Sequence, residues 1–340
     1  MGFLSIIFQG AVIHKNKLCC DVIENIAITR HYFPKDEIIL STWKLSAQLR
    51  QQLQELLKTL QVVIIESEDP GSLVYRERET RWVTNINRMI VSSRQGIGRA
   101  THSHVVKLRT DSRLYNRNIA YFLQLCEEEE KDQVYPRDQA YSLFRQRIIN
   151  GNLFARNVRG YMPYLFHPGD ILLAGNKQDL LDLFDIPLAD ESIFEVCFCF
   201  SIFSLMRYVP EQYIWVKYIE KVTGVNEFPG NCFTSEHLKK TSENFYINNF
   251  IPYSSEALGF LWNKYSEVYK NKGLSSVYTT ADWVALQHQP SNAEAGISIL
   301  SQKADSVWIF ILRTILWIKF TPLHIPFIRR LAIKMFSRRS

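Results

Sequence analysis

The sequence predicts an α/β fold with a mainly parallel sheet. Three apolar runs, at residues 3–8, 37–40 and 62–65, have the length of buried strands, and small or polar residues follow each of them. Two longer segments between these runs, 18–31 and 46–60, carry apolar residues at helical spacing. Strands that alternate with helices in this way form parallel sheets with right-handed crossovers.

A fourth strand follows a predicted helix over residues 85–99. Residues 104–111, HVVKLRTD, form a short apolar strand that ends in two cations and a carboxylate. Because the carboxyl ends of parallel strands lie at one edge of a sheet, we expect four strand ends to meet there. Open α/β folds bind their ligands at that edge, so the sequence predicts a site for a phosphorylated ligand.

The second half of the chain mixes helices with shorter strands. The acidic run 127–130 is typical of a solvated helix face rather than a metal site, because adjacent like charges do not converge on one point. Residues 163–187 predict a strand, a turn and a short helix. Residues 195–206 fit either a strand or a buried helix. Another helix begins at Val209-Pro210, since proline is favoured in a first helical turn.

The tail, residues 301–340, is predicted to be a basic, amphipathic, aromatic segment. Its longest uncharged run, Val307 to Leu312, is far shorter than the roughly 20 residues that a spanning helix needs. Aromatic side chains alternate there with arginine and lysine, which suits a segment lying on an anionic membrane surface. The alternative is a terminal helix packed on the body of the protein.

The charge of the chain is concentrated in this tail. The formal net charge is +6, but the segment from Val307 to Ser340 holds seven cations and no carboxylate. The remaining residues therefore carry about one negative charge, and we expect no nucleic-acid partner. The six cysteines form no metal-ligand spacing, so we expect reduced core thiols. No basic segment or cleavage site accompanies the apolar N-terminus, and we expect a cytoplasmic protein.

Three charged residues at the end of the fourth strand are the first candidates for ligand binding. Lys107 and Arg109 alternate with Leu108, so their side chains point to one face of the strand. Asp111 follows them and could hold Mg²⁺ or Mn²⁺, because these cations prefer oxygen ligands and keep phosphate oxygens as partners. In the alternative interpretation, one of the two cations simply pairs with Asp111.

The ends of the other strands supply further candidates. Gln9 and Gly10 follow the first strand, where a glycine lets the backbone approach a nucleotide closely. Thr42 and Trp43 follow the second strand and offer a hydroxyl and an aromatic face to a base or a sugar ring, although Trp43 could instead cap the core. Asp69 follows the third strand, in what could be a simple turn.

Asn87 and Arg88 lie near the start of the predicted helix 85–99. The N-terminus of a helix attracts anions, and an arginine there can bind a phosphate through two parallel hydrogen bonds. The alternative is a helix cap followed by an exposed arginine.

Two carboxylates of the second half are candidates for a general base. Glu211 lies in the first turn of a helix, and Asp170 follows the turn formed by residues 167–169. Either could serve only within hydrogen-bond reach of an acceptor hydroxyl. Glu211 could instead only complement the helix dipole. His167 is more typical of a structural, hydrogen-bonded histidine.

Eight segments within residues 6–214, in order along the chain, together resemble the WavE-type lipopolysaccharide and capsule synthesis proteins of bacteria. These segments are IIFQGAV (6–12), IAITRHYFPKDEIILSTW (26–43), SEDPG (67–71), NINRMIVSSRQGI (85–97), VVKLRTD (105–111), FHPGD (166–170), AGNKQDLLDLFDIP (174–187) and VPEQYI (209–214).

The resemblance implies a GT-A-like glycosyltransferase that uses a nucleotide-sugar donor. It places Asp111 where such enzymes keep the last carboxylate of an Asp-x-Asp motif. The first position of that motif is here Arg109, so a cation stands where a metal ligand is expected. Gly169 stands where we would expect a serine, while Asp170 is kept.

On this basis we expect a hexosyltransferase-type enzyme of lipopolysaccharide or capsule synthesis. Residues 1–300 would form the catalytic domain, with a donor-binding half at 1–115 and an acceptor half at 116–300. The tail, 301–340, would hold the enzyme on the cytoplasmic face of the membrane as a peripheral protein. Its partners would be a nucleotide sugar, a lipid-linked or growing saccharide, and an anionic membrane surface.

Other classes of protein fit the sequence less well. A nucleotidyltransferase or sugar-phosphate transferase could use a similar sheet, but the former usually has a glycine-rich basic loop after its first strand, and QGAV (9–12) lacks it. A dinucleotide oxidoreductase would also need its glycines there, whereas GIG (96–98) lies in a predicted helix. A non-catalytic scaffold of the polysaccharide machinery would keep the sheet without a working site.

Overall fold

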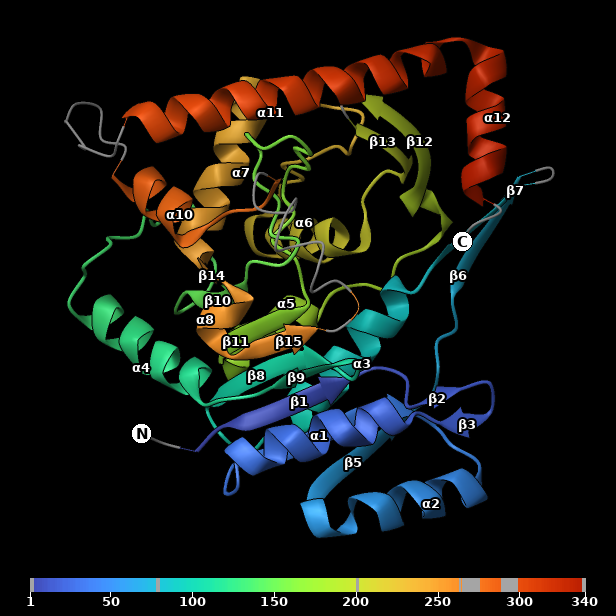
Figure 1. The fold of residues 1–340 in the computed structure, drawn as a ribbon, viewed down its shortest axis with the longest axis vertical. Coiled ribbons are helices and arrows are strands. Elements are labelled where there is room, and N and C mark those ends of the chain that lie inside the picture. Colours follow the sequence, from blue (N-terminus) through green and yellow to red (C-terminus); the bar gives the residue numbers. More distant parts are fainter. Residues whose placement is uncertain are drawn as a thin grey trace.

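A seven-stranded mixed sheet forms the centre of the molecule (Figure 1). The structure is a computed structural model that describes residues 3–77, 80–199, 202–262, 264, 276–288 and 299–337. In spatial order, the strands are β14 (Phe250–Tyr253), β10 (Ile148–Gly151), β11 (Leu172–Asn176), β8 (His104–Arg109), β1 (Ser5–Gln9), β4 (Glu37–Trp43) and β5 (Val62–Ser67).

The four strands predicted from the first half of the chain are adjacent and parallel. Ile7 in β1 lies opposite Ile39 in β4 on one side and opposite Lys107 in β8 on the other, and β5 pairs with β4. The central residues of β1 and β4 are fully buried, which explains why their sequences are continuous apolar runs rather than alternating ones. β8 is buried as well, with Lys107 interrupting its apolar run. The predicted mainly parallel α/β fold is confirmed.

The chain reverses its path across the sheet at β1. Helices α1 (Cys20–Tyr32) and α2 (Ala47–Leu57) lead from β1 to β4 and from β4 to β5, whereas α3 (Ile86–Arg99) leads back to β8 on the other side of β1. Right-handed crossovers therefore place α3 on the face opposite α1 and α2. The reversal leaves a crevice at the carboxyl ends of β1 and β8, where open α/β sheets bind ligands.

The second half of the chain extends the same sheet through a reversed strand. β11 is antiparallel to both β8 and β10, and β10 is parallel to β14. The strand, turn and short helix predicted for residues 163–187 correspond to β11 and α5, and the helix predicted after Val209 is α6. The helices of this half are α4 (Asn118–Lys131), α5 (Lys177–Phe184), α6 (Pro210–Thr223), α7 (Glu236–Asn249), α8 (Ser255–Leu258) and α10 (Thr280–Gln287).

Four two-stranded sheets accompany the central sheet in the described part of the chain. The sequence allowed a strand or a helix for residues 195–206, and the described residues of this stretch, 195–199 and 202–206, lie in two paired strands. The pairs are β2 (Ile13–His14) with β3 (Lys17–Leu18), β6 (Leu73–Glu77) with β7 (Thr80–Thr84), β9 (Ser112–Leu114) with β15 (Phe260–Trp262), and β12 (Phe194–Cys199) with β13 (Ile202–Met206).

The acidic run 127–130 lies in α4, but the prediction of a plain solvated face was wrong. Glu127 Oε1 lies 2.8 Å from His104 Nε2, and Glu130 Oε1 lies 3.6 Å from the Nη1 of the buried Arg147. Both partners come from strands or loops distant in sequence. The run therefore helps to fix α4 against the sheet.

All six cysteines are free thiols. Cys126 and Cys197 are buried, as expected for core thiols, and burial raises the pKa of Cys126 to about 12. The expectation of core thiols does not hold for the others, because Cys20 is exposed and the remaining three are half-buried.

The tail folds into two helices, α11 (Ile299–Phe320) and α12 (Pro326–Ser337). α11 crosses one end of the molecule, above α7 and the β12–β13 hairpin, and α12 turns down from its end toward β7 (Figure 1). The last tail residues, 338–340, lie outside the described residues.

One described helical stretch, Val307–His324, is long and apolar enough to cross a membrane by length and composition. Its mean hydropathy is 1.3, and 6% of it is buried inside the protein. The sequence argument from uncharged runs was too strict, because a stretch of this length tolerates the charges of Arg313 and Lys319. Length therefore does not exclude a spanning helix here.

Candidate active site

A cleft of about 860 Å³ opens at the carboxyl ends of β8, β1, β4 and β5. Its volume lies in the range of pockets that hold small ligands and cofactors, and its position is the switch point of the sheet. Of the ten residues predicted to bind a donor, Asn87 and Lys107 do not line this cleft. The other eight do: Gln9, Gly10, Thr42, Trp43, Asp69, Arg88, Arg109 and Asp111.

Gln9 and Gly10 end β1 inside the cleft. Gly10 has a φ of +132°, a conformation that glycine adopts without strain, and a Cβ there would meet Thr110 Oγ1 at 3.1 Å. The side chain of Gln9 is fixed, because its Oε1 accepts a hydrogen bond of 2.7 Å from Ser92 Oγ. Gly10 lines the cleft, and its N–H donates to the Ser41 carbonyl at 3.0 Å.

Thr42 and Trp43 end β4 at the same cleft. The Thr42 hydroxyl is buried and has no hydrogen-bond partner among the described residues. An unsatisfied buried hydroxyl costs free energy, and a polar group of a ligand would satisfy it. Trp43 is half-buried, so part of its indole is accessible to a ligand in the cleft.

Arg88 is bound to Asp69 in the wall of the cleft. Its Nε and Nη2 donate to the two carboxylate oxygens of Asp69 at 2.7 and 2.5 Å. Its Nη1 donates to Ser72 Oγ and Asn85 Oδ1, both at 3.0 Å. The hydrogen bonds from Arg88 lower the pKa of Asp69. The guanidinium of Arg88 is therefore already hydrogen-bonded within the protein, and it does not present two free N–H donors to a phosphate in this structure.

Asn87, the neighbour of Arg88, points away from the cleft. Its buried side chain donates to the Ala189 carbonyl at 2.9 Å and accepts from the Ala189 N–H at 2.8 Å. Successive residues on a helix point about 100° apart, so Asn87 and Arg88 could not both face one ligand. Asn87 instead joins α3 to the loop after α5.

Arg109 and Asp111 form a bidentate ion pair at the end of β8. The Nε and Nη2 of Arg109 donate to Oδ1 and Oδ2 of Asp111, both at 2.8 Å. The guanidinium also lies over the Trp262 ring, 5.2 Å from its centroid. Burial opposes both charges, but the pairing outweighs it, lowering the pKa of Asp111 and raising the pKa of Arg109. Of the two interpretations of this strand end, the structure has the paired one.

This arrangement does not fit a divalent-cation site at Asp111. Both of its carboxylate oxygens already accept hydrogen bonds from Arg109. Asp69, another carboxylate of the cleft, is held by Arg88 in the same way. Among the described residues, one group of three potential metal ligands comes together within 4.8 Å, and none of its members lines the cleft: Glu195, Cys197 and Cys232.

Lys107 lies beneath the cleft rather than in it. It is fully buried, and its Nζ donates to the backbone carbonyl of Asp170 and, at 3.1 Å, to Oδ2 of the Asp170 carboxylate. Lys107 and Arg109 do share a face of β8, but Lys107 is two residues, or about 7 Å, farther into the sheet. Burial lowers the pKa of Lys107, and the charge of Asp170 offsets part of this effect.

Glu211 lies beside this pair at the start of α6. Burial, reinforced by the charge of Asp170, raises the pKa of Glu211 to about 7. The His167 Nε2 atom lies 3.7 Å from Glu211 Oε2. This contact is not an ion pair at neutral pH, because burial and the charge of Arg156 lower the pKa of His167 to about 3. We call Lys107, His167, Asp170 and Glu211 the acid cluster.

Arg109 connects the cleft to the acid cluster. Its guanidinium lines the cleft, and the charges of Asp170 and Glu211 both act to raise its pKa. Arg156 supplies a further positive charge to Glu211, and its buried Nε has no hydrogen-bond partner among the described residues. The two carboxylates predicted as bases are therefore brought together, next to the cation at the inner end of the cleft.

The turn that presents Asp170 requires its glycine. Gly169 has a φ of +76°, and a Cβ there would lie 2.9 Å from the carbonyl oxygen of Leu153. Asn150 in β10 donates from its Nδ2 to the Pro168 carbonyl and so holds the turn. A serine, which the resemblance led us to expect at this position, would clash with the backbone.

Trp262 and Arg156 are residues of the site that the sequence analysis missed. Trp262 comes from β15, which pairs antiparallel with β9 immediately after Asp111, Trp262 lying opposite Ser112. Neither residue stands in a local pattern that marks it as functional. The sequence alone could not have identified them, because contacts between residues distant in sequence bring Trp262 to Arg109 and Arg156 to Glu211.

Residues 4–315 match the protein family described as WavE lipopolysaccharide synthesis. No curated protein sequence matches the chain. Among solved structures, the chain is similar to the galactosyltransferase LgtC in complex with donor and acceptor sugar analogs, with a TM-score of 0.36 and 8% sequence identity. That alignment covers 88% of this chain and 99% of LgtC.

The glycosyltransferase GlyE of Streptococcus pneumoniae TIGR4 is similar with a TM-score of 0.34 and 10% identity, over 93% of this chain and 62% of GlyE. A cytidylyltransferase from Leptospira borgpetersenii serovar Hardjo-bovis follows with a TM-score of 0.30 and 13% identity, over 75% and 76% of the two chains. In other alignments, the chain spans 59% of an active-site mutant of LgtC and 33% of TarS from S. aureus.

These TM-scores are too low to support an argument about activity. The family match is independent of them and extends over nearly the whole chain. It also contains every segment on which the resemblance in the sequence was based. The chain belongs to the WavE lipopolysaccharide synthesis family.

Proposed function

We propose that the protein is a GT-A-like glycosyltransferase that transfers a sugar from a nucleotide-sugar donor to a lipid-linked or growing saccharide. The observation that carries this proposal is a cleft at the switch point of the sheet that meets the buried Asp170 and the half-buried Glu211 through Arg109. Membership of a lipopolysaccharide synthesis family supports a saccharide as the product. Residues 1–115 supply the cleft, and residues 116–300 supply the carboxylates.

The cleft offers the contacts that a nucleoside diphosphate needs. The unsatisfied hydroxyl of Thr42 suits a polar group of the donor, and the indole of Trp43 suits its base or sugar ring. Arg109 provides the charge for the diphosphate. It stands where the first metal ligand of the Asp-x-Asp motif is expected, so we propose that this cation takes over charge balance.

Glu211 is the better of the two candidates for the base. Asp170 is tied to Lys107 by charge and hydrogen bonds, whereas Glu211 has a pKa of about 7 and so can take up a proton near neutral pH. In an inverting transfer, the acceptor oxygen attacks the anomeric carbon as the bond from that carbon to the diphosphate breaks. The hydroxyl proton passes to Glu211, and the nucleoside diphosphate leaves with its charge balanced by Arg109.

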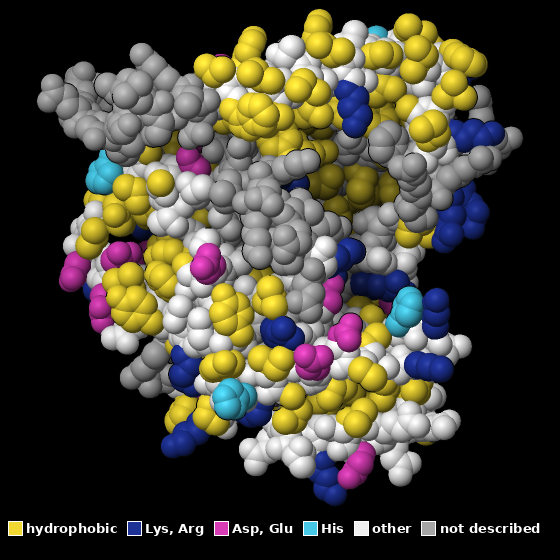
Figure 2. Space-filling model, viewed as in Figure 1, with side chains coloured by type: hydrophobic (Ala, Val, Ile, Leu, Met, Phe, Trp, Pro, Cys, Tyr) yellow, Lys and Arg dark blue, Asp and Glu magenta, His cyan; other side chains and the backbone are white. Residues whose placement is uncertain are grey.

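The tail is proposed to hold the enzyme on the cytoplasmic face of an anionic membrane, peripherally. α11 carries a band of exposed apolar side chains, which Figure 2 shows across one end of the molecule. The same helix is attached to the body, because Arg313 Nε donates to the Gly160 carbonyl at 3.0 Å and Phe320 packs near Phe198. A helix docked along its length favours a surface position over a spanning one.

A panel of nucleotide sugars tests the proposed reaction. Each donor is incubated with the full-length protein and a lipid-linked saccharide extract, in Mg²⁺, in Mn²⁺ or in excess chelator. We expect one donor to release a free nucleoside diphosphate, and we expect the rate in chelator to stay within about twofold of the rate with metal. Release of pyrophosphate or a nucleoside monophosphate would instead indicate nucleotidyl or sugar-phosphate transfer.

The Asp111→Asn variant tests the cleft. Without the carboxylate, Arg109 loses its bidentate partner, so we expect the KM for the donor to rise by about tenfold or more. Full activity in a folded Asp111→Asn protein would contradict the assignment of this strand end. Failure of the wild-type protein to bind any nucleotide in calorimetry would favour a non-catalytic scaffold.

A further inference from the structure

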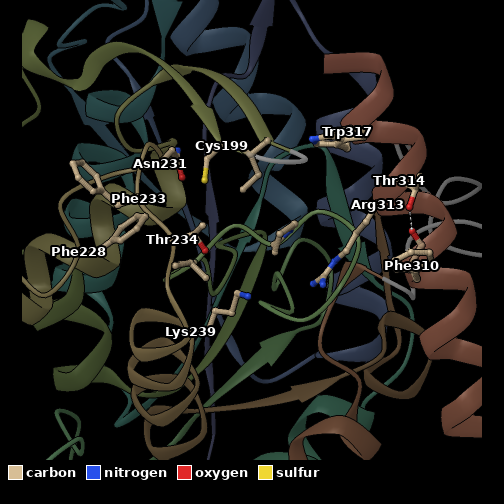
Figure 3. A pocket seen from close by; sticks show the side chains of 13 residues that line it. Cys199, Phe228, Asn231, Phe233, Thr234, Lys239, Phe310, Arg313, Thr314 and Trp317 are labelled. Carbon is tan, nitrogen blue, oxygen red and sulfur yellow. Dashed lines mark hydrogen bonds between the residues drawn. The ribbon is translucent and has the colours of Figure 1, made fainter. Parts of the chain in front are cut away.

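A second cavity, of about 380 Å³, lies between α11 and the body of the protein (Figure 3). Its walls come from α11, from the β12–β13 hairpin and from the segment that precedes α7. Most of the side chains that line it are apolar, among them Leu165, Phe228, Phe310 and Trp317. It shares no lining residue with the cleft at the strand ends, and no residue of the acid cluster lines it.

Two cations reach this cavity from opposite walls. Arg313 extends from α11 and Lys239 from α7, and Figure 3 shows both side chains directed into the same space. Lys239 Nζ lies 2.6 Å from Glu236 Oε1, and Arg313 donates to the Gly160 carbonyl. No carboxylate lines the cavity within the described part of the chain. Its lining therefore combines an apolar chamber with an excess of positive charge.

Large aromatic side chains of the cavity remain exposed. Phe310 and Trp317 line it and are nevertheless 70% and 50% exposed. Apolar surface of this size is stabilised when hydrocarbon covers it. Val307, Ile311 and Ile318 of the same helix are also exposed, so α11 contributes both a wall of the cavity and exposed apolar surface, which Figure 2 shows as a band across one end of the molecule.

The cavity lies next to the acid cluster. Leu165 lines the cavity, and its carbonyl accepts a hydrogen bond of 2.7 Å from the side chain of Gln212, the residue after Glu211. Asn231 also lines the cavity and exchanges two hydrogen bonds of 2.9 Å with Gln212. One residue, Phe166, stands between Leu165 of the cavity wall and His167 of the acid cluster. Residues of the cavity wall and of the cluster are therefore neighbours in the chain and are linked through Gln212.

We propose that this cavity binds the hydrocarbon chain of a lipid phosphate, with Lys239 and Arg313 on its phosphate group. The proposal rests on the proposed function, because such a lipid would be the carrier of the saccharide acceptor. The chain would enter from the apolar face of α11, and the head group would direct the attached sugar toward Glu211.

A chain-length series measures this binding without turnover. The full-length protein is titrated with n-alkyl phosphates, and binding is followed by tryptophan fluorescence and by calorimetry. The Kd should fall by about fourfold for each added methylene group until the cavity is filled, and then level off. Inorganic phosphate alone should bind far more weakly.

Matched variants locate the site. Thr314→Trp places an indole inside the cavity and should weaken binding of a long alkyl phosphate by at least about tenfold. Leu56→Trp adds a large ring at an exposed position of α2 and should leave binding unchanged. Lys239→Gln should weaken binding of the alkyl phosphate but not of the alkyl alcohol of equal length, since only the phosphate needs the cation.

The possible results distinguish a failure of the lipid-binding proposal from a failure of the proposed function. Equal affinity for inorganic and alkyl phosphate, or unchanged binding in a folded Thr314→Trp protein, would overturn the proposal. It would also fail if Thr314→Trp abolished self-association of the chain while lipid binding persisted, because the occupant would then be a second copy. Intact lipid binding without transfer from any donor refutes only the proposed function. Transfer to a water-soluble saccharide without alkyl phosphate binding refutes only the cavity.

Discussion

Glu211 can accept a proton only in its ionised form, and its raised pKa places that change near neutral pH. The rate of transfer should therefore rise with pH through about 7 and level off above it. Glu211→Gln should lower kcat by about 10²- to 10⁴-fold and remove this pH dependence. Initial rates between about pH 5.5 and 8.5 measure both effects. Glu220→Gln, on the same helix, should behave as the wild type, and an unchanged kcat in Glu211→Gln would exclude Glu211 as the base.

The same carboxyl should limit the stability of the fold. A pKa raised above its ordinary value means that Glu211 stabilises the folded state fully below that ordinary value, and that this contribution is lost as pH rises through about 7. Glu211→Gln should therefore unfold at a higher denaturant concentration than the wild type at about pH 8, by roughly 1 to 3 kcal/mol, and with no such gain at about pH 5. A gain at both pH values would point to a cause other than ionisation.

Lys107 and Asp170 form the one strongly buried ion pair of the site. Removing one partner leaves an uncompensated buried charge, so Lys107→Met should lower the free energy of unfolding by about 3 to 5 kcal/mol. Lys107→Met combined with Asp170→Asn should recover much of this loss. Urea unfolding of both single variants and the double variant gives the coupling energy. Additive losses would mean that the two charges do not depend on each other.

Local geometry decides which site residues the sequence could identify. Gln9, Thr42 and Arg109, which the sequence places at strand ends, line the cleft, because parallel strands bring their carboxyl ends together whatever else the fold contains. Lys107 is on the same strand as Arg109, but it lies too deep in the sheet to reach the cleft. Asn87 is on the same helix as Arg88, but it points to a different side of that helix. Neither depth nor rotation relative to a cleft is visible before the neighbouring elements are placed.

At the scale of elements, α11 should bind membranes through its exposed apolar side chains, and α12 should bind them through its positive charges. Ile315→Glu with Ile318→Glu places charges on the exposed apolar face of α11 and should release the protein from vesicles of any composition. Arg329→Gln with Arg330→Gln should weaken binding to anionic vesicles by about 30-fold at low salt, at roughly 1 kcal/mol per charge, and leave binding to neutral vesicles unchanged.

Vesicle co-sedimentation at two salt concentrations measures these effects. Leu56→Glu, at an exposed apolar position on α2, controls for added charge alone and should bind as the wild type. Full binding by the α11 double variant would exclude its apolar face as the attachment surface.

Helices and strands whose apolar residues recur at a regular spacing could be predicted from the sequence. Short strands that form only by pairing with residues distant in sequence could not. The helices α1, α2, α3 and α6 and the four parallel strands begin near the predicted positions, since apolar spacing and cap residues such as Ser46 mark them. β10 and β14 are four residues each and pair with one another across about a hundred residues of sequence. Strands that short carry too few residues to establish a pattern of their own.

At the scale of the whole molecule, the candidate site depends on both halves of the chain. The cleft belongs to β1, β4, β5 and β8, whereas Asp170 and Glu211 come from the turn before β11 and from α6. β11 joins the two by pairing antiparallel with β8 along Leu108 to His104. The sequence predicted one catalytic domain with a donor-binding half and an acceptor half, and it could not show that one continuous sheet holds the two halves at a fixed distance.

A continuous sheet should make the catalytic body unfold as one cooperative unit. Fluorescence of Trp43 reports on the cleft, and that of Trp215, a buried residue of α6, reports on the second half. Variants that keep only one of these tryptophans therefore separate the two signals. Because β8 is shared by both halves, opening either half breaks the β8–β11 pairing, and the two probes should give the same urea midpoint and slope. Two resolved transitions would mean that the halves are independent domains, and the position of Glu211 relative to the cleft would then be free to change.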